Sequence, residues 1–207
     1  MNTLPFSKDD FKGSDIDSIT NIYDHLKKNF LIDYDSKFTC NLSEFELFNY
    51  YKDVNIGQVI SVNNNIATFY LTFTQVAYKL PTASKYLSPA TCEYQTWGIA
   101  ILKSNYGHIL MKPETILDRI HDLINPTKID FEDDRKFSEK FYAVTTDELK
   151  AKSKIDLSFR NAVESIQTKD FFIEIIDNKL IIGNKKTIEV DSALAFSDFL
   201  NTVSKLP

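Results

Sequence analysis

The chain has few of the residues on which common functional sites depend. Its 207 residues include only five glycines, three histidines, two cysteines and one tryptophan. Loops that hold phosphate groups need glycine, because their backbone must approach the ligand without an intervening side chain. Neither the Walker fingerprint nor the dinucleotide-binding fingerprint is present, and no Gly-x-Ser-x-Gly motif marks a nucleophilic serine. The sequence therefore predicts no nucleotide-type cofactor.

The thiols and imidazoles also lack the spacings of known sites. Cys40 and Cys92 are too few and too far apart for a disulfide framework, and we expect both to be buried thiols. His25, His108 and His121 form neither a His-x3-His nor a Glu-x-x-His pair, and the acidic run at 130–134 lacks the glycine of a calcium loop. The sequence predicts no metal site.

Positive charge and long apolar runs are scarce as well. The formal net charge is −5, so the chain has no general attraction to nucleic acid or to anionic lipid. The longest uncharged apolar stretch, near Thr96–Leu102, is far too short to span a bilayer, and the N-terminus carries charge where a secretory signal needs an apolar core. We expect a cytoplasmic protein that does not bind nucleic acid. The sequence does not support a membrane association.

What the chain does contain is a helix signal followed by strand signals. After a lead of about 14 residues, a helix capped by Ser14 or Asp15 is predicted. Its apolar stripe is Ile16, Ile19, Ile22, Tyr23, Leu26 and Phe30. From residue 41 to residue 114 the pattern is that of strands joined as an antiparallel meander. The predicted strands cover residues 57–62, 66–78, 93–103 and 108–112, with a hairpin turn at 63–65.

The C-terminal part mixes strands and helices. We expect a short helix at 115–123, an edge strand at 128–131 and a strand at 137–144. Thr145 and Glu148 form a predicted capping box, and Asp156 is expected to cap the next helix. A hairpin is predicted about residues 177–178, then a strand at 187–190, and Asp191 should cap the last helix.

These patterns indicate an α+β protein. An antiparallel meander sheet fills the N-terminal half, and a strand-helix-helix-hairpin-helix arrangement fills the C-terminal half. We favour one domain over residues 1–207, with a subdomain boundary near 113–128 as the alternative. That boundary would separate residues 1–40 and 41–114 from residues 115–207.

One segment resembles a known family. Phe137-x3-Phe141-x5-Asp147-x3-Ala151, followed by a helix and a hairpin, is similar to a bacterial family of conserved proteins of unknown function. Relatives in that family often carry membrane anchors, so the resemblance implies a fold and a membrane-associated context but no activity. This chain departs from the family pattern at Ala143, where a valine is usual.

The leading functional hypothesis is a non-enzymatic interaction or scaffold module with an unknown protein or small ligand as its partner. In the strand at 66–78, Thr68, Tyr70, Thr72 and Thr74 share one face, and with Tyr94 or Trp97 of a neighbouring strand they form the candidate binding residues. The competing explanation is that other parts of the chain cover this face.

Two alternatives remain open. The first is an enzyme whose site forms only in three dimensions, which would gather at least two of His25, His108, His121, Glu93 and Asp130 in a pocket. The second is a cytoplasmic-side accessory domain of a membrane-associated system, which the family resemblance implies.

Overall fold

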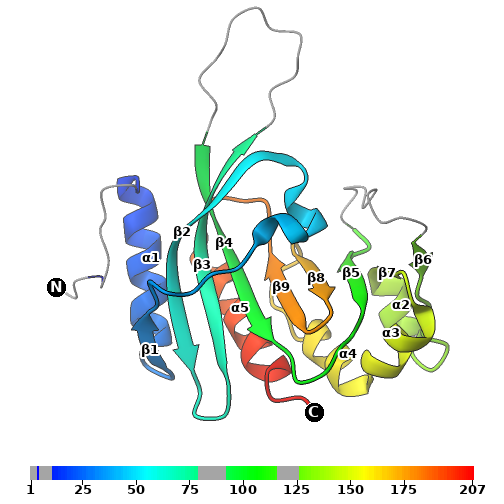
Figure 1. The fold of residues 1–207 in the computed structure, drawn as a ribbon. Helices are drawn as coiled ribbons and strands as arrows, with labels where there is room; N and C mark the ends of the chain where they lie inside the picture. Colours follow the sequence, from blue (N-terminus) through cyan, green and yellow to red (C-terminus); the bar gives the residue numbers. More distant parts are fainter. Residues whose placement is uncertain (1–3, 5–10, 79–91, 116–125) are drawn as a thin grey trace, which may run out of the picture.

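The fold is α+β, built on one large antiparallel sheet (Figure 1). The computed structural model describes residues 4, 11–78, 92–115 and 126–207. Within them the sheet has nine strands in the order β1-β2-β3-β4-β9-β8-β5-β7-β6. The strands are β1 (Leu31–Tyr34), β2 (Tyr51–Asn63), β3 (Thr68–Tyr78), β4 (Cys92–Ile101), β5 (His108–Pro113), β6 (Thr127–Lys128), β7 (Phe141–Thr145), β8 (Phe172–Ile176) and β9 (Lys179–Gly183).

The predicted meander, which joined β2 to β5 in sequence order, is interrupted between β4 and β5. Strands β1 to β4 are neighbours in sequence order, but β9 and β8 lie between β4 and β5. The loop after β4 crosses the end of the β8-β9 hairpin, where Leu102 N–H donates to Asn178 O and Tyr106 N–H donates to Asp177 O. The C-terminal half therefore supplies the centre of the sheet. The boundary and helix predicted within 113–128 lie largely outside the described residues.

Two long helices pack on one face of the sheet. They are α1 (Gly13–Leu26) and α5 (Val190–Val203), and α5 packs against α1, β3, β4 and β9. The predicted stripe of α1 is confirmed, because Ile19, Ile22 and Leu26 are buried in the larger core. The shorter helices are α2 (Arg135–Lys140), α3 (Glu148–Lys154) and α4 (Leu157–Glu164). Apolar side chains of all five helices contribute to this same core.

A stretch of chain without long helices covers part of the opposite face. Residues 35–50, which we name the cover segment, contain the 3-10 helices η1 (Leu42–Glu44) and η2 (Glu46–Phe48). In Figure 1 this segment crosses in front of the sheet after β1. Its Phe45 and Phe48 belong to a second apolar cluster with Trp97, and the Phe48 and Trp97 ring centroids are 4.7 Å apart.

Several predicted boundaries are wrong by a few residues. Helix α1 begins after Lys12 without a side-chain cap, and α5 begins after Glu189 rather than at Asp191. Residues 187–189, expected as a strand, form none. Residues 137–140, also expected as a strand, belong to α2, because the Asp134 side chain accepts from Phe137 N–H and begins a helix there.

The cap of α3 is Asp147, whose side chain accepts from Lys150 N–H. The predicted cap, Thr145, instead ends β7 and donates its hydroxyl to His108 O. Asp156 caps α4 as expected, accepting from Phe159 N–H. Thr145 and Asp147 both have short polar side chains that can cap a helix. Because β7 extends to Thr145, the cap of α3 falls to Asp147.

The contact between Gly183 and Trp97 gives a test of the packing. A Cβ at Gly183 would lie 2.3 Å from Trp97 Cε3, whereas a Cβ at Gly13 would meet nothing within 4 Å. We expect Gly183→Ala to lower the free energy of unfolding by about 1–3 kcal/mol, because the buried ring has no room to move. Gly13→Ala, the matched control, should be neutral or stabilise by up to about 1 kcal/mol. Urea denaturation measures both, and equal effects would contradict the packing.

Candidate functional site: a groove beside the free edge of β2

The cover segment is fixed to the sheet by one buried carboxylate. Glu174 on β8 has no exposed surface, and its two oxygens accept from Glu46 N–H and Leu47 N–H, each at 3.0 Å. These donors are backbone groups in the first turn of η2, which have no partner within so short a helix. His108 Nε2 lies 2.8 Å from Glu174 Oε1. The carboxylate therefore ties η2 to β8 and β5.

The residues of the enzyme hypothesis do not come together in the described part of the chain. His108 is half-buried against Glu174, His25 is exposed on α1, and Asp130 is exposed beyond β6. Glu93 accepts from the Tyr78 hydroxyl near the start of β4. His121 lies outside the described residues. The groove described below contains none of these four residues in its lining, so it does not assemble the predicted site.

The residues predicted to bind a partner occupy both faces of the sheet. Thr72 and Trp97 have no exposed surface, which is contrary to an accessible face, because the cover segment lies over this part of the sheet. Tyr94 is buried in the core on the other face, against Phe11. Tyr70 alone is half-buried, stacked on Phe38 of the cover segment with ring centroids 4.1 Å apart. A role for Tyr70 in binding stays a prediction.

A chain of polar side chains lies on the same face as Trp97. Gln95 Oε1 accepts from the Tyr51 hydroxyl at 3.0 Å and from Trp97 Nε1–H at 3.2 Å. Gln95 Nε2–H donates to Glu93 Oε1 at 2.9 Å. Each of these buried polar groups has a partner, so the network fixes the side chains rather than offering groups to a ligand.

The chain leaves the edge of the sheet at Asp35. Asp35 N–H donates to Val59 O, and the Asp35 side chain then accepts from Lys37 N–H and Phe38 N–H, which turns the chain across the sheet face. Strand β1 therefore pairs only with residues 60–63 of β2. Along residues 52–58, β2 has β3 on one side and no backbone partner on the other among the described residues.

Two irregularities limit this free edge. The register between β2 and β3 shifts between Tyr51 and Asp53 and again between Ile56 and Gln58, leaving a regular stretch at 53–56. Gly57 lies at the second shift, where a Cβ would be 2.8 Å from Phe73 O. Bulges of this kind bend a strand. In Figure 1 the first half of β2 curves towards η2.

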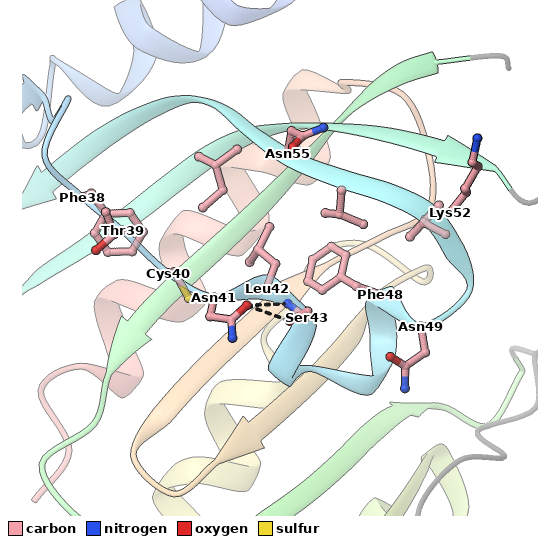
Figure 2. A pocket seen from close by; sticks show the side chains of 13 residues that line it. Phe38, Thr39, Cys40, Asn41, Leu42, Ser43, Phe48, Asn49, Lys52 and Asn55 are labelled. Carbon is pink, nitrogen blue, oxygen red and sulfur yellow. Dashed lines mark hydrogen bonds between the residues drawn. The ribbon is translucent and has the colours of Figure 1, made fainter.

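A groove of about 580 Å³ lies between this half of β2 and the cover segment. In Figure 2, Phe38 and Thr39 lie at one end of it and Asn49 and Lys52 at the other. Asn41 Oδ1 accepts from Ser43 N–H and Ser43 Oγ–H and thereby holds η1 along its side (Figure 2). The lining is Phe38, Thr39, Cys40, Asn41, Leu42, Ser43, Phe48, Asn49, Tyr51, Lys52, Val54, Asn55 and Ile56.

The groove offers apolar surface and neutral amides rather than reactive groups. Lys52 is the one charged residue in its lining. Burial raises the pKa of the Cys40 thiol, an effect that outweighs the nearby Lys179 charge. The neutral thiol is a poor nucleophile, so the lining suits binding better than covalent catalysis. In the described part of the chain, no group of three or more His, Cys, Asp or Glu could hold a metal.

The prediction that both cysteines are buried is wrong. Cys40 is half-buried in the groove and Cys92 is exposed at the start of β4, and both are free thiols. Sequence reasoning also missed the groove. The signal that could have revealed it was Gly57 inside a strand pattern, since such a glycine often marks a bulge.

Comparisons with known proteins assign no family to this chain. Neither a protein-family model nor a curated protein matches it. Among solved structures, the crystal structure of the mycobacterial trehalose monomycolate transport factor A is similar, with a TM-score of 0.41 at 9% identity. The match covers 95% of this chain and 99% of that chain. A likeness of this size carries no functional conclusion.

The helices of the described residues are too short or too polar for a transmembrane span.

Removing the Glu174 carboxylate should release the cover segment. Glu174→Ala leaves two η2 amides, one buried and one half-buried, without an acceptor, and we expect it to lower the free energy of unfolding by about 3 kcal/mol. Glu174→Gln keeps one acceptor oxygen and should cost less. Glu132→Ala, an exposed carboxylate, is the control and should change stability by less than about 0.5 kcal/mol. If urea denaturation finds Glu174→Ala as stable as the control, Glu174 is not the anchor.

The pair of His108 and Glu174 should make stability depend on pH. Burial lowers the pKa of His108, but the hydrogen bond and charge of Glu174, with the charges of Glu46 and Asp177, outweigh burial and raise it. A histidine whose pKa is raised in the folded state stabilises the protein at pH values below the ordinary histidine pKa of about 6.5. That stabilisation is lost as the pH rises through the pKa of the folded state.

The difference in unfolding free energy between wild type and His108→Gln should therefore be constant at low pH and shrink above about pH 6.5. Urea denaturation at several pH values measures this difference. A difference that grows with pH would contradict the assigned pairing.

Proposed function

We propose that the protein is a non-enzymatic interaction module that binds an extended polypeptide segment in the groove beside β2. The observation that carries the proposal is the edge of β2 at residues 53–56, which has no strand partner among the described residues and lies directly next to a groove lined by apolar and neutral polar side chains. An added strand would gain backbone hydrogen bonds from the edge and side-chain contacts from the groove.

The edge is suited to a short partner. Exposed strand edges are usually blocked by charges, bulges or covering segments, because they otherwise pair with other chains. Here two bulges bound the regular stretch at 53–56, so a long uninterrupted ladder, as in a fibril, does not fit. A partner of a few residues does fit, since it needs only the regular stretch.

The groove supplies the matching side-chain contacts. Val54 and Ile56 are half-buried and lie two residues apart, so they share one side of β2. Leu42 and Phe48 of the cover segment line the same groove. A volume of about 580 Å³ is in the range of specific small binding sites. Apolar side chains at alternate positions of a bound strand would fill it.

An enzyme is less well supported. The groove lining includes one thiol with a raised pKa and one lysine but no carboxylate or imidazole that could act as an acid or base. His108 has a buried carboxylate partner, yet that carboxylate is committed to two backbone amides of η2. We therefore assign the His108–Glu174 pair to fixing the cover segment. An accessory role in a membrane-associated system remains the family-based alternative.

Selection of peptides by the purified full chain tests the proposal. A displayed library of ten-residue peptides should give binders with apolar residues at alternate positions. Fluorescently labelled copies of these peptides should show a rise in fluorescence anisotropy when they bind the protein. Methylating those alternate backbone nitrogens of the peptide that face β2 should weaken binding at least about tenfold, because strand pairing needs the N–H groups of the peptide at these positions. Methylating the other set of nitrogens is the control and should have little effect.

A variant pair locates the binding site. Val54→Glu puts a charge into the groove and should weaken binding at least about tenfold. Ile66→Glu makes the same kind of change at a residue that is 69% exposed and not part of the groove lining, and should leave binding unchanged. If Val54→Glu fails to fold, protection of the amides at 53–56 from hydrogen exchange by the wild-type complex decides the question.

Failure to select any peptide, or binding that ignores both methylation sets and Val54→Glu, would overturn the proposal. Binding of small apolar compounds without peptide binding would do so too.

A further inference from the structure

We propose that the groove selects peptides that present a carboxylate at its Lys52 end. This inference rests on the proposed function. It specifies in addition which charge the bound segment carries and in which direction the segment lies in the groove. The carboxylate belongs either to an aspartate or glutamate side chain or to a free C-terminus, since both offer the same oxygens to an ammonium group.

The argument begins with the distribution of charge along the groove. Lys52 is the one charged residue in the lining, and it lies at the end marked by Asn49, opposite Phe38 (Figure 2). The protein as a whole has a net charge of −5. A single cation in a groove of an acidic protein is a local exception, and it distinguishes one end of a bound strand from the other.

The ammonium group of Lys52 is only weakly engaged. Its described ion pair is with Asp53 at 4.0 Å, and both side chains are more than 60% exposed. An exposed pair at that distance contributes little, so exchanging it for a ligand carboxylate costs little.

The opposite end of the groove is apolar. There Phe38 stacks on Tyr70 with an interplanar angle of 30°, and the lining next to Phe38 is Thr39 and Cys40. The groove lining at this end offers no counter-charge to a ligand carboxylate, since Lys179 near Cys40 is already paired with Glu44. The two ends therefore differ in chemistry, and a strand with apolar alternate residues followed by a carboxylate matches both.

The test uses peptides from the selection on the wild-type full chain. Each peptide is made with a carboxylate or an amide in the side chain at the Lys52 end, and separately with a free or an amidated C-terminus. We expect neutralising the relevant carboxylate to weaken binding about three- to fivefold, as an exposed ion pair allows. The arm that loses affinity identifies the source of the carboxylate.

Charge exchange then identifies the lysine. Lys52→Glu should weaken the carboxylate peptide about tenfold and should prefer a peptide with lysine at that position. Lys37→Glu makes the same charge change in an exposed residue next to Phe38 at the other end, and should alter binding less than twofold.

The outcomes separate this inference from the proposed function. Peptides that bind wild type equally with and without either carboxylate overturn the charge selection but leave peptide binding intact. Equal effects of Lys52→Glu and Lys37→Glu on peptide binding also overturn the charge selection. They would show that the net charge of the protein, rather than the position of Lys52, controls binding. An absence of all peptide binding overturns the proposed function as well.

Discussion

The fold of the cover segment depends on the buried carboxylate of Glu174. A charged group without exposed surface is stable only where hydrogen bonds replace water, and here two backbone amides of η2 and His108 do so. Because those amides begin η2, the same contact positions Phe48 over Trp97. It thereby also fixes one wall of the groove. Loss of the carboxylate would affect the sheet, the cover and the candidate site together.

The cover segment explains why one sheet edge is open. A strand that stayed beside β2 would have paired with its whole length, but the Asp35 side chain turns the chain away after Tyr34. The chain then covers apolar side chains of β4, β5 and β9 that would otherwise face water. Covering the sheet face and leaving residues 52–58 of β2 without a second strand partner in the described part of the chain are thus two results of one turn.

The groove also shows how a binding surface can form without reactive side chains. Its polar groups are mainly amides and hydroxyls, and its apolar surface comes from β2, the two 3-10 helices and Phe38. Such a lining favours backbone and side-chain contacts of modest strength, in which the fixed shape of the site decides specificity. The buried network at Gln95 supports that shape from beneath, since its hydrogen bonds hold Tyr51 and Trp97 in place.

Local sequence patterns predicted helices α1, α4 and α5 and most strands, but not α2, where a strand was expected. The stripe of Ile19, Ile22 and Leu26, the cap at Asp156 and the alternation of β3 needed only neighbouring residues, because helix and strand periods are local properties. The insertion of β8 and β9 between β4 and β5, the burial of Thr72 and Trp97, and the groove were decided by the tertiary structure. Glu174 shows the reason: its partners Glu46 and Leu47 are 128 and 127 residues away, and no local pattern specifies such a pairing.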